Sequence, residues 1–122
     1  MNETPVETLR RAAKLMRERA EAASPGPWHQ MCMGSDGCSV INDGRLRDRR
    51  HVSFSGRKEW KADHADAEYI ASMHPLVAMA LADVLDREAR AAELAGQDPD
   101  AINLPDEQIL KTARVYLGEV AA

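Results

Sequence analysis

The feature that most constrains the fold is a long apolar run over residues 66–85 that a proline divides in two. Its large apolar residues recur every three or four positions, as they do along one face of a helix: Ile70, Met73, Val77, Leu81, Val84 and Leu85. Pro75 lacks a backbone N–H and restricts His74 before it to extended conformations. We therefore expect one helix over 64–73, capped by Asp63, and a second over 75–95 that starts at Pro75.

A first helix is predicted over residues 4–23. Thr4, Pro5 and Glu7 supply a capping hydroxyl, a proline for the first turn and a glutamate for the reciprocal capping bond. Apolar residues then recur at steps of three and four: Val6, Leu9, Ala13, Met16, Ala20 and Ala23. The segment Ser24-Pro25-Gly26-Pro27-Trp28 ends this helix, and we expect Trp28 to seal the end of the helical core.

The middle of the chain loses the helical period. Short runs at 28–33, 38–42 and 51–55 are separated by glycine-rich and Asp-Gly turn formers, which predicts an antiparallel β-meander over 28–55. A last helix is predicted over 105–118, because Asp106 and Glu107 favour a helix start. The expected fold is a single α+β domain over 1–122, a small bundle of three to four helices with a two- to three-stranded antiparallel β-meander inserted after helix one.

Composition indicates a folded protein outside the membrane. Of the 122 residues, 44% are hydrophobic and 30% charged, which is typical of a globular chain rather than a disordered one. No window approaches the roughly 20 apolar residues of a membrane span, and the first residues lack the pattern of a secretory signal. We therefore expect a soluble, cytoplasmic protein in which Cys32 and Cys38 are free thiols.

The net charge of −4 is unevenly distributed. Residues 45–61 contain seven basic side chains against two acidic ones, a local charge of +5. Guanidinium groups and aromatic faces bind phosphates and bases. The candidate residues for an anion or nucleotide site are Arg45, Arg47, Arg49, Arg50, Arg57, Lys58, Trp60 and Lys61. The sequence favours a solvated loop whose arginines pair with acidic helices of the same chain or a neighbour, and anion binding is the alternative. Duplex DNA is not expected, because the chain as a whole is acidic and has no recognition-helix motif.

A zinc site is a weaker alternative. Thiolates and imidazoles are the usual zinc ligands, and the candidates are His29, Cys32 and Cys38, with His51 or His64. The two cysteines lie six positions apart, however, and no second spaced pair occurs, unlike in recognised zinc motifs. We therefore predict no metal and no other cofactor, and keep a small zinc-dependent hydrolase only as an alternative.

Acid–base catalysis has a candidate cluster around the start of the 64–73 helix. Asp63, Asp66 and Glu68 lie near His64, so carboxylates and an imidazole fall within six residues. Carboxylates are also favoured at helix starts for electrostatic reasons alone. No nucleophile elbow, P-loop or dinucleotide fingerprint occurs, so the sequence favours a protein without catalytic residues.

Two fragments resemble a known family. The box Ser24-Pro25-Gly26-Pro27-Trp28 follows an alanine-rich helix, and the box Asp66-Ala67-Glu68-Tyr69-Ile70-Ala71 leads to Pro75 and an apolar helix. Together they resemble the small phage and prophage accessory proteins of the ead type, whose actinobacterial relatives carry an (S/T)PGPW box upstream of a DAxxIA box. The resemblance covers residues 8–88, with a variable β-like insert between the boxes. It implies a phage origin and a location in the host cytoplasm, and it supplies no catalytic residues.

The expected function is therefore that of a non-enzymatic phage-type accessory or interaction protein. Its expected partner is a host protein or a small anionic ligand such as a nucleotide. Binding to a membrane is not expected. The first alternative is a nucleotide-sequestering or nucleic-acid-binding module that uses residues 45–61. The apolar stripes of the first helix and of residues 76–85 exceed what one small core covers, so a homodimer through helix faces is a further expectation.

Overall fold

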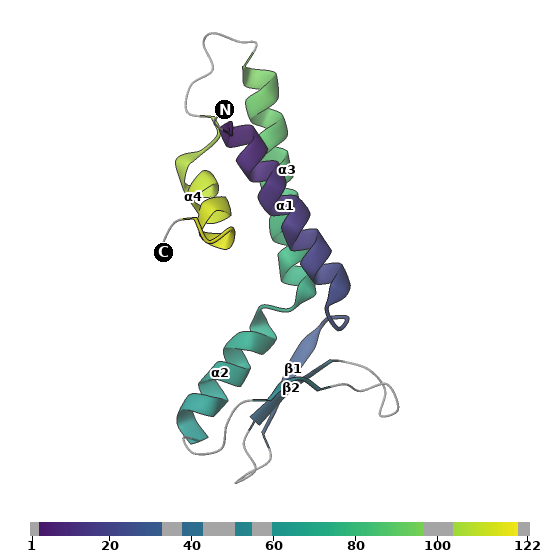
Figure 1. Cartoon of the computed structure of the whole chain (residues 1–122). Helices are drawn as coiled ribbons and strands as arrows, with labels where there is room; N and C mark the ends of the chain where they lie inside the picture. Colours follow the sequence, from purple (N-terminus) through teal and green to yellow (C-terminus); the bar gives the residue numbers. More distant parts are fainter. Residues whose placement is uncertain (1–2, 33–37, 43–50, 55–59, 97–103, 120–122) are drawn as a thin grey trace. The chain divides into compact units, whose positions relative to one another are not determined.

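The computed structural model describes residues 3–32, 38–42, 51–54, 60–96 and 104–119, with only the backbone described for 51–54 and 60–64. These ranges contain helices α1 (Pro5–Ala22), α2 (Trp60–Ser72), α3 (Pro75–Ala95) and α4 (Glu107–Tyr116) (Figure 1). They also contain strands β1 (Trp28–Cys32), β2 (Cys38–Asn42) and β3 (His51–Phe54). The predicted α+β fold, with an antiparallel meander after the first helix, is confirmed.

The chain divides into two compact units. One, the helical unit, comprises residues 1–18 and 79–122 and contains most of α1 and α3 together with α4. The other, the sheet unit, comprises residues 19–78 and contains the three strands and α2. The bundle therefore consists of three helices, and the fourth, α2, belongs with the sheet.

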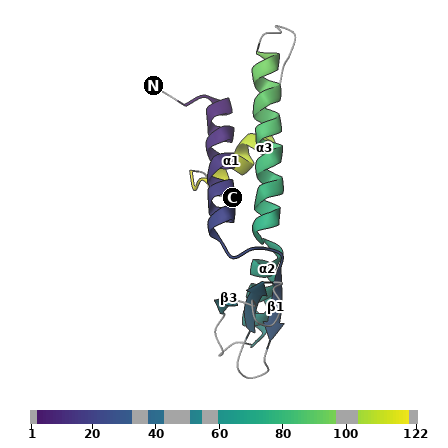
Figure 2. The same ribbon diagram turned by 90° about the vertical axis from the view of Figure 1, so that its right-hand side faces the viewer.

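The core of the helical unit is built largely from alanine. Helices α1 and α3 run antiparallel and side by side, and α4 packs against them (Figure 1, Figure 2). The buried residues are Leu9, Ala12, Ala13, Met16, Ala82, Leu85, Ala89 and Ala113. Alanine lets helix backbones approach closely but buries little apolar area of its own. The few large residues, Leu9, Met16 and Leu85, therefore contribute most of the buried area.

Ion pairs join α1 to α3 along the edge of this core. The Arg17 guanidinium donates to Asp83 at 2.8 Å and also to Asp86, and these hydrogen bonds raise the pKa of Arg17. About two turns earlier in α1, Arg10 pairs with Glu93. Such exposed pairs each contribute about 0 to 1 kcal/mol. Their main effect here is to favour one register of α1 against α3.

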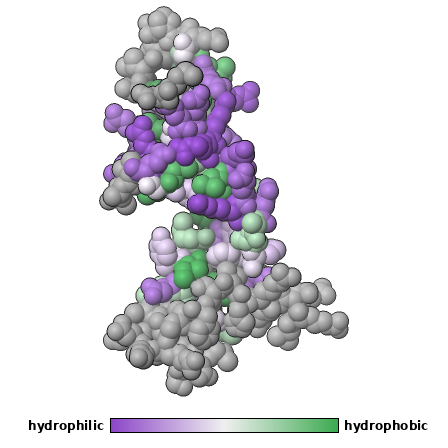
Figure 3. Space-filling view, viewed as in Figure 1, coloured by the Kyte–Doolittle hydropathy of each residue, from purple (hydrophilic) through white to green (hydrophobic). Residues whose placement is uncertain are grey.

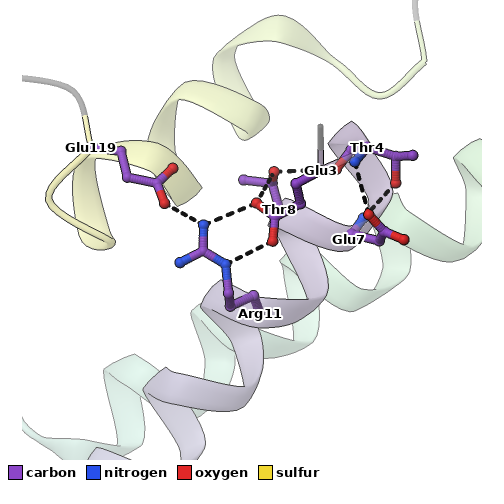
Figure 4. Close-up of polar contacts among 6 residues, drawn as sticks. All are labelled: Glu3, Thr4, Glu7, Thr8, Arg11 and Glu119. Carbon is purple, nitrogen blue, oxygen red and sulfur yellow. Dashed lines mark hydrogen bonds and ion pairs between the residues drawn. The ribbon is translucent and has the colours of Figure 1, made fainter. Parts of the chain in front are cut away.

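The start of α1 has the predicted reciprocal cap (Figure 4). The backbone N–H of Glu7 donates to the Thr4 hydroxyl at 3.1 Å, and the backbone N–H of Thr4 donates to the Glu7 carboxylate at 2.9 Å. Both bonds satisfy donors that a helix start otherwise leaves without a partner. The local sequence signal for this helix end is therefore confirmed.

Arg11 links the two ends of the helical unit (Figure 4). Its guanidinium donates to both oxygens of the Glu3 carboxylate, at 2.8 and 2.9 Å, and to Glu119 beyond α4. The Thr8 hydroxyl donates to the same Glu3 carboxylate at 2.8 Å. Hydrogen bonds from Arg11 and then from Thr8 lower the pKa of Glu3 from 4.5 to about 2. The ionised form of Glu3 is therefore favoured in the folded chain.

Acidification is expected to weaken the helical unit through this contact. Because the pKa of Glu3 is lower in the folded chain than in the unfolded one, its contribution is complete above about pH 4.5 and is lost as the pH falls toward 2. Urea unfolding at about pH 6 and about pH 3 should show a smaller loss of stability in Arg11→Gln than in the parent chain. Lys14→Gln is the control, since Lys14 pairs only weakly with Glu18. An unchanged pH dependence in Arg11→Gln would contradict the assignment.

Helix α4 is shorter than predicted at both ends. Asp106 is its N-cap, and its carboxylate accepts from the backbone N–H groups of Gln108 and Ile109 at 2.9 and 3.1 Å. At the other end Gly118 has a φ of +76°, which glycine adopts without strain, and the N–H of Glu119 donates back to the Arg114 carbonyl. The helix therefore spans Glu107–Tyr116 rather than 105–118.

In the sheet unit, β2 is the central strand and pairs antiparallel with both β1 and β3. Helix α2 packs on β1 and β2 through Ala67 and Ala71, which lie one turn apart. The buried residues of the apolar cluster beneath α2 are Cys38, Val40, Ala67 and Ala71, with Trp28, Cys32 and Ile70 packed around them. The expectation that Trp28 seals the helical core was wrong. Its strand pairs with β2, so the indole joins the core of the sheet unit.

Helix α2 begins at Trp60, four residues before the predicted start, and Asp63 therefore lies within the helix instead of capping it. The break between α2 and α3 falls where it was predicted. Helix α3 starts at Pro75, and the N–H of Val77 donates to the His74 carbonyl at 2.9 Å. Proline fits here because a first-turn N–H has no intrahelical partner.

The prediction of free cysteines was wrong. Cys32 and Cys38 are directly opposite each other in the register of β1 and β2, and they form a disulfide. Their Cα atoms are 4.0 Å apart, since residues at facing positions of antiparallel strands approach closely. Sequence separation alone did not reveal this, because the pairing depends on the strand register.

Candidate functional site

A shallow groove of about 390 Å³ lies in the sheet unit between β1 and the C-terminal part of α2. It combines an indole with several polar side chains. The residues that line it are Pro27, Trp28, His29, Gln30, Glu68, Ala71, Ser72 and His74. We refer to it as the Trp28 groove. Among the described residues of the sheet unit, it is the feature best suited to hold another molecule.

The first wall of the groove comes from the Ser24–Trp28 box. The Trp28 indole N–H donates to the carbonyl of Ser24 at 2.9 Å, which fixes the ring against the turn that precedes β1. Proline restricts the backbone of this turn, so the indole has little freedom to leave its position. The side chain is partly buried on the sheet-unit core and partly available in the groove.

The second wall comes from the Asp66–Ala71 box and the residues after it. Gly26 of the first box lies directly against this wall, since a Cβ at Gly26 would be 3.0 Å from His74 Nδ1 and 3.3 Å from Pro75 Cδ. Glycine permits this close approach, because a side chain at this position would require His74 or Pro75 to shift. The two boxes, which are about 40 residues apart in the sequence, pack on each other and together form the groove.

His74 connects the groove to the start of α3. Its Nδ1 atom is buried and has no hydrogen-bond partner among the described residues, while its backbone carbonyl accepts from Val77. Packing against Gly26 thus holds the ring in place without a polar contact at Nδ1. His74 therefore lies at the junction between the Trp28 groove and α3.

The predicted acid–base cluster is only partly assembled at the groove. Glu68 lines it, whereas Asp66 is exposed and is not among the lining residues. Asp63 and His64 lie in α2, and their side chains are outside the described residues. The groove can therefore offer a carboxylate, an amide, a hydroxyl and imidazoles for hydrogen bonding, together with an aromatic face.

The sulfur ligands of the alternative zinc site are not free to bind a metal in this structure. Cys32 and Cys38 are joined in a disulfide, so neither supplies a thiolate in this structure. Within the described ranges, no group of three or more histidine, cysteine or acidic side chains could hold a metal ion. His51 and His64 are candidates whose side chains fall outside those ranges.

The predicted anion site cannot be placed in the same way. Six of its residues lie outside the described chain: Arg45, Arg47, Arg49, Arg50, Arg57 and Lys58. For the other two, Trp60 and Lys61 at the start of α2, only the backbone is described. By contrast, the groove residues His29, Gln30 and Ser72 were not predicted as one site. The only sequence signal that pointed to their position was the pair of boxes.

Large apolar side chains are exposed beside the groove. In the sheet unit, Tyr69 is 68% exposed, Met73 50% and Leu76 55%. In the helical unit, polar residues cover most of the surface visible in Figure 3, and Leu94 near the end of α3 is 66% exposed. None of the helices in the described ranges has the length and apolar character needed to cross a membrane.

No protein-family model, curated protein or solved structure matches the chain. The chemistry of the groove and of its neighbouring residues is therefore the basis on which a function can be assigned. Two properties define it: a fixed indole among hydrogen-bonding side chains, and exposed apolar residues on the adjoining helical turns.

Proposed function

We propose that this chain is a non-enzymatic accessory protein that binds a partner protein through the Trp28 groove and the apolar residues beside it. The observation that carries the proposal is the exposure of Tyr69, Met73 and Leu76 next to a groove that already contains an indole. Large apolar side chains are normally withdrawn from water, and several exposed together on one segment indicate an interaction surface.

The positions of Tyr69 and Met73 favour one continuous surface. Tyr69 lies in the last turn of α2, and Met73 is the first residue after that helix, where its N–H donates to the Ile70 carbonyl at 3.1 Å. Each directly follows a groove residue, since Glu68 precedes Tyr69 and Ser72 precedes Met73. The apolar pair is therefore adjacent in the chain to residues that line the groove.

The composition of this surface suits a protein partner better than a small molecule. Tryptophan, tyrosine and methionine are enriched at the centres of protein interfaces, and aromatic residues often contribute most of the binding energy. Methionine also adapts its shape to different partners. Small-molecule sites, in contrast, enclose most of the ligand surface, whereas this groove is shallow.

The resemblance to phage accessory proteins of the ead type supports the same proposal. Both boxes that carry the resemblance contribute residues to the groove, Pro27 and Trp28 from the first and Glu68 and Ala71 from the second. In a phage or prophage setting, the partner would be a protein of the host cell. The proposal requires no catalytic residue and no cofactor.

The proposal predicts that removing the exposed apolar pair weakens partner binding. The test compares the parent chain with Tyr69→Ser/Met73→Ser, each immobilised and exposed to a host-cell lysate, with retained proteins quantified by mass spectrometry. We expect at least a tenfold loss of the specific partner, equivalent to about 1.4 kcal/mol. Leu94→Ser is the matched control, because Leu94 is as exposed as Tyr69 but lies in the helical unit.

Two results would count against this proposal. Equal losses in the double variant and in Leu94→Ser would show that general surface stickiness, not the Trp28 groove, retains the protein. Loss of retained material only on charge reversal at Arg47, Arg49 and Arg50, together with its sensitivity to salt, would instead favour the anion-binding alternative.

A further inference from the structure

We propose that the Cys32–Cys38 disulfide is a reversible redox control of the Trp28 groove, such that the groove is formed in the oxidised chain and loosened in the reduced one. The inference concerns regulation of the site described above and rests on the proposed function for its biological meaning. The structural part of the inference needs no partner and can be tested alone.

The disulfide is connected to both walls of the groove. On the β1 side, the Gln30 amide, which belongs to the groove lining, donates to Cys32 Sγ at 3.2 Å. On the α2 side, Cys38 is fully buried and packs in one cluster with Ala67 and Ala71, and Ala71 also lines the groove. The bond thus joins the strand of one wall to the core beneath the other.

The sheet unit has few other means of holding these walls. The buried members of its described apolar cluster are one half-cystine, one valine and two alanines, with Trp28 and Ile70 packed against them. Alanine contributes little apolar area, so the cluster depends on a few larger side chains. Small units with such limited cores commonly depend on a covalent or metal link for stability. The Cys32–Cys38 bond is the covalent link available among the described residues.

The chemical step is thiol–disulfide exchange with a dithiol reductant. Its thiolate attacks Cys32 Sγ, because Cys32 is partly exposed whereas Cys38 is fully buried. The sulfur–sulfur bond breaks, and Cys38 leaves as a thiolate that takes up a proton. The second thiol of the reductant then displaces Cys32. The protein gains two electrons and two protons, and the reductant becomes a disulfide.

Reduction changes the packing beneath the groove. Two unbonded sulfur atoms cannot stay at bonding distance, so the sulfur atoms of Cys32 and Cys38 must separate. Because Cys38 packs in one cluster with Val40, Ala67 and Ala71, a shift of its sulfur atom disturbs the packing of α2 on β2. The geometry between Trp28 on β1 and Ala71 on α2 is then no longer fixed by the core.

Hydrogen–deuterium exchange of the intact chain, before and after treatment with dithiothreitol, tests this inference. We expect exchange in β1 and α2 to become at least tenfold faster on reduction and to return to its first value on reoxidation. Amides of α4 and of α3 beyond Met79 serve as the internal control and should not change. Cys32→Ser/Cys38→Ser is the matched variant, whose exchange dithiothreitol should leave unaltered.

Unchanged exchange in β1 and α2, with both thiols shown by alkylation to be free, would overturn the inference. Equal acceleration in the helical unit, or failure to recover on reoxidation, would overturn it as well, since neither is a reversible control of the groove. Because exchange is measured without any partner, failure of the Tyr69→Ser/Met73→Ser test would reject the proposed function and leave this result standing.

Discussion

Replacing Leu85 with alanine is expected to lower the free energy of unfolding of the helical unit by about 2 to 5 kcal/mol. Leu85 is fully buried and belongs to the core that α1, α3 and α4 share. Five of the eight buried residues in that core are alanines, which have no flexible side chain to move into a cavity. The cost should therefore include the lost burial of the leucine and most of the cavity term.

Urea unfolding followed by the helical circular dichroism signal measures this loss. Leu94→Ala is the matched control, because it removes the same atoms from the same helix at a position that is 66% exposed. Its effect should stay within about 0.5 kcal/mol. Equal destabilisation by the two substitutions would contradict the assignment of Leu85 to the core.

Enlarging a buried alanine should destabilise the same unit by about 1 to 3 kcal/mol. Ala89 is fully buried in α3, in the same core cluster as Leu9 and Ala12 of α1. In Ala89→Leu, three additional carbon atoms have to fit where close helix packing leaves no room. The helices must move apart or the leucine must adopt an unfavourable rotamer.

Ala91→Leu, two residues away on the same helix, is the control for this prediction. Ala91 is exposed, and leucine and alanine are both good helix formers, so the substitution should be nearly neutral. Thermal unfolding of the two variants side by side is sufficient as a measurement. A neutral Ala89→Leu would show that α1 and α3 do not pack as closely as described.

The disulfide in the sheet unit differs from the free thiols that the sequence predicted. The sequence indicated a cytoplasmic protein with two free thiols, and in such a compartment glutathione and thioredoxin keep most thiols reduced. The structure instead places Cys32 and Cys38 at facing positions and joins them. The reversible disulfide proposed above fits the structure and also the compartment that the sequence predicts. This is the situation that the exchange experiment addresses.

Much of the fold could be predicted because its signals are local. The Thr4–Glu7 cap and the apolar period located α1, and Pro75 located the start of α3. Alternation and turn formers located β2 and its neighbours. Each of these features depends on residues within a few positions of one another, so no knowledge of the tertiary structure was required.

The candidate site could be predicted only in part. The two boxes marked Trp28 and Glu68 as part of a recognisable pattern, yet nothing in that pattern stated that they face each other across a groove. His29 was considered as a zinc ligand and Ser72 was not considered at all. The basic residues of 45–61, which the sequence offered as a candidate binding site, lie mostly outside the described chain.

By itself, the sequence determined which segments are helices and strands. It did not determine which residues of each apolar face are buried, since Met73 and Val84 were expected on one buried face and are 50% and 45% exposed. Only the tertiary structure decided which partner covers each face: α2 packs on the sheet, Trp28 joins the sheet-unit core, and Cys32 meets Cys38. The physical reason is that periodicity reports the existence of a buried face, whereas packing between distant segments depends on shape and register. The Trp28 groove is built from residues about 40 positions apart, so it depends on packing between distant segments and not on periodicity.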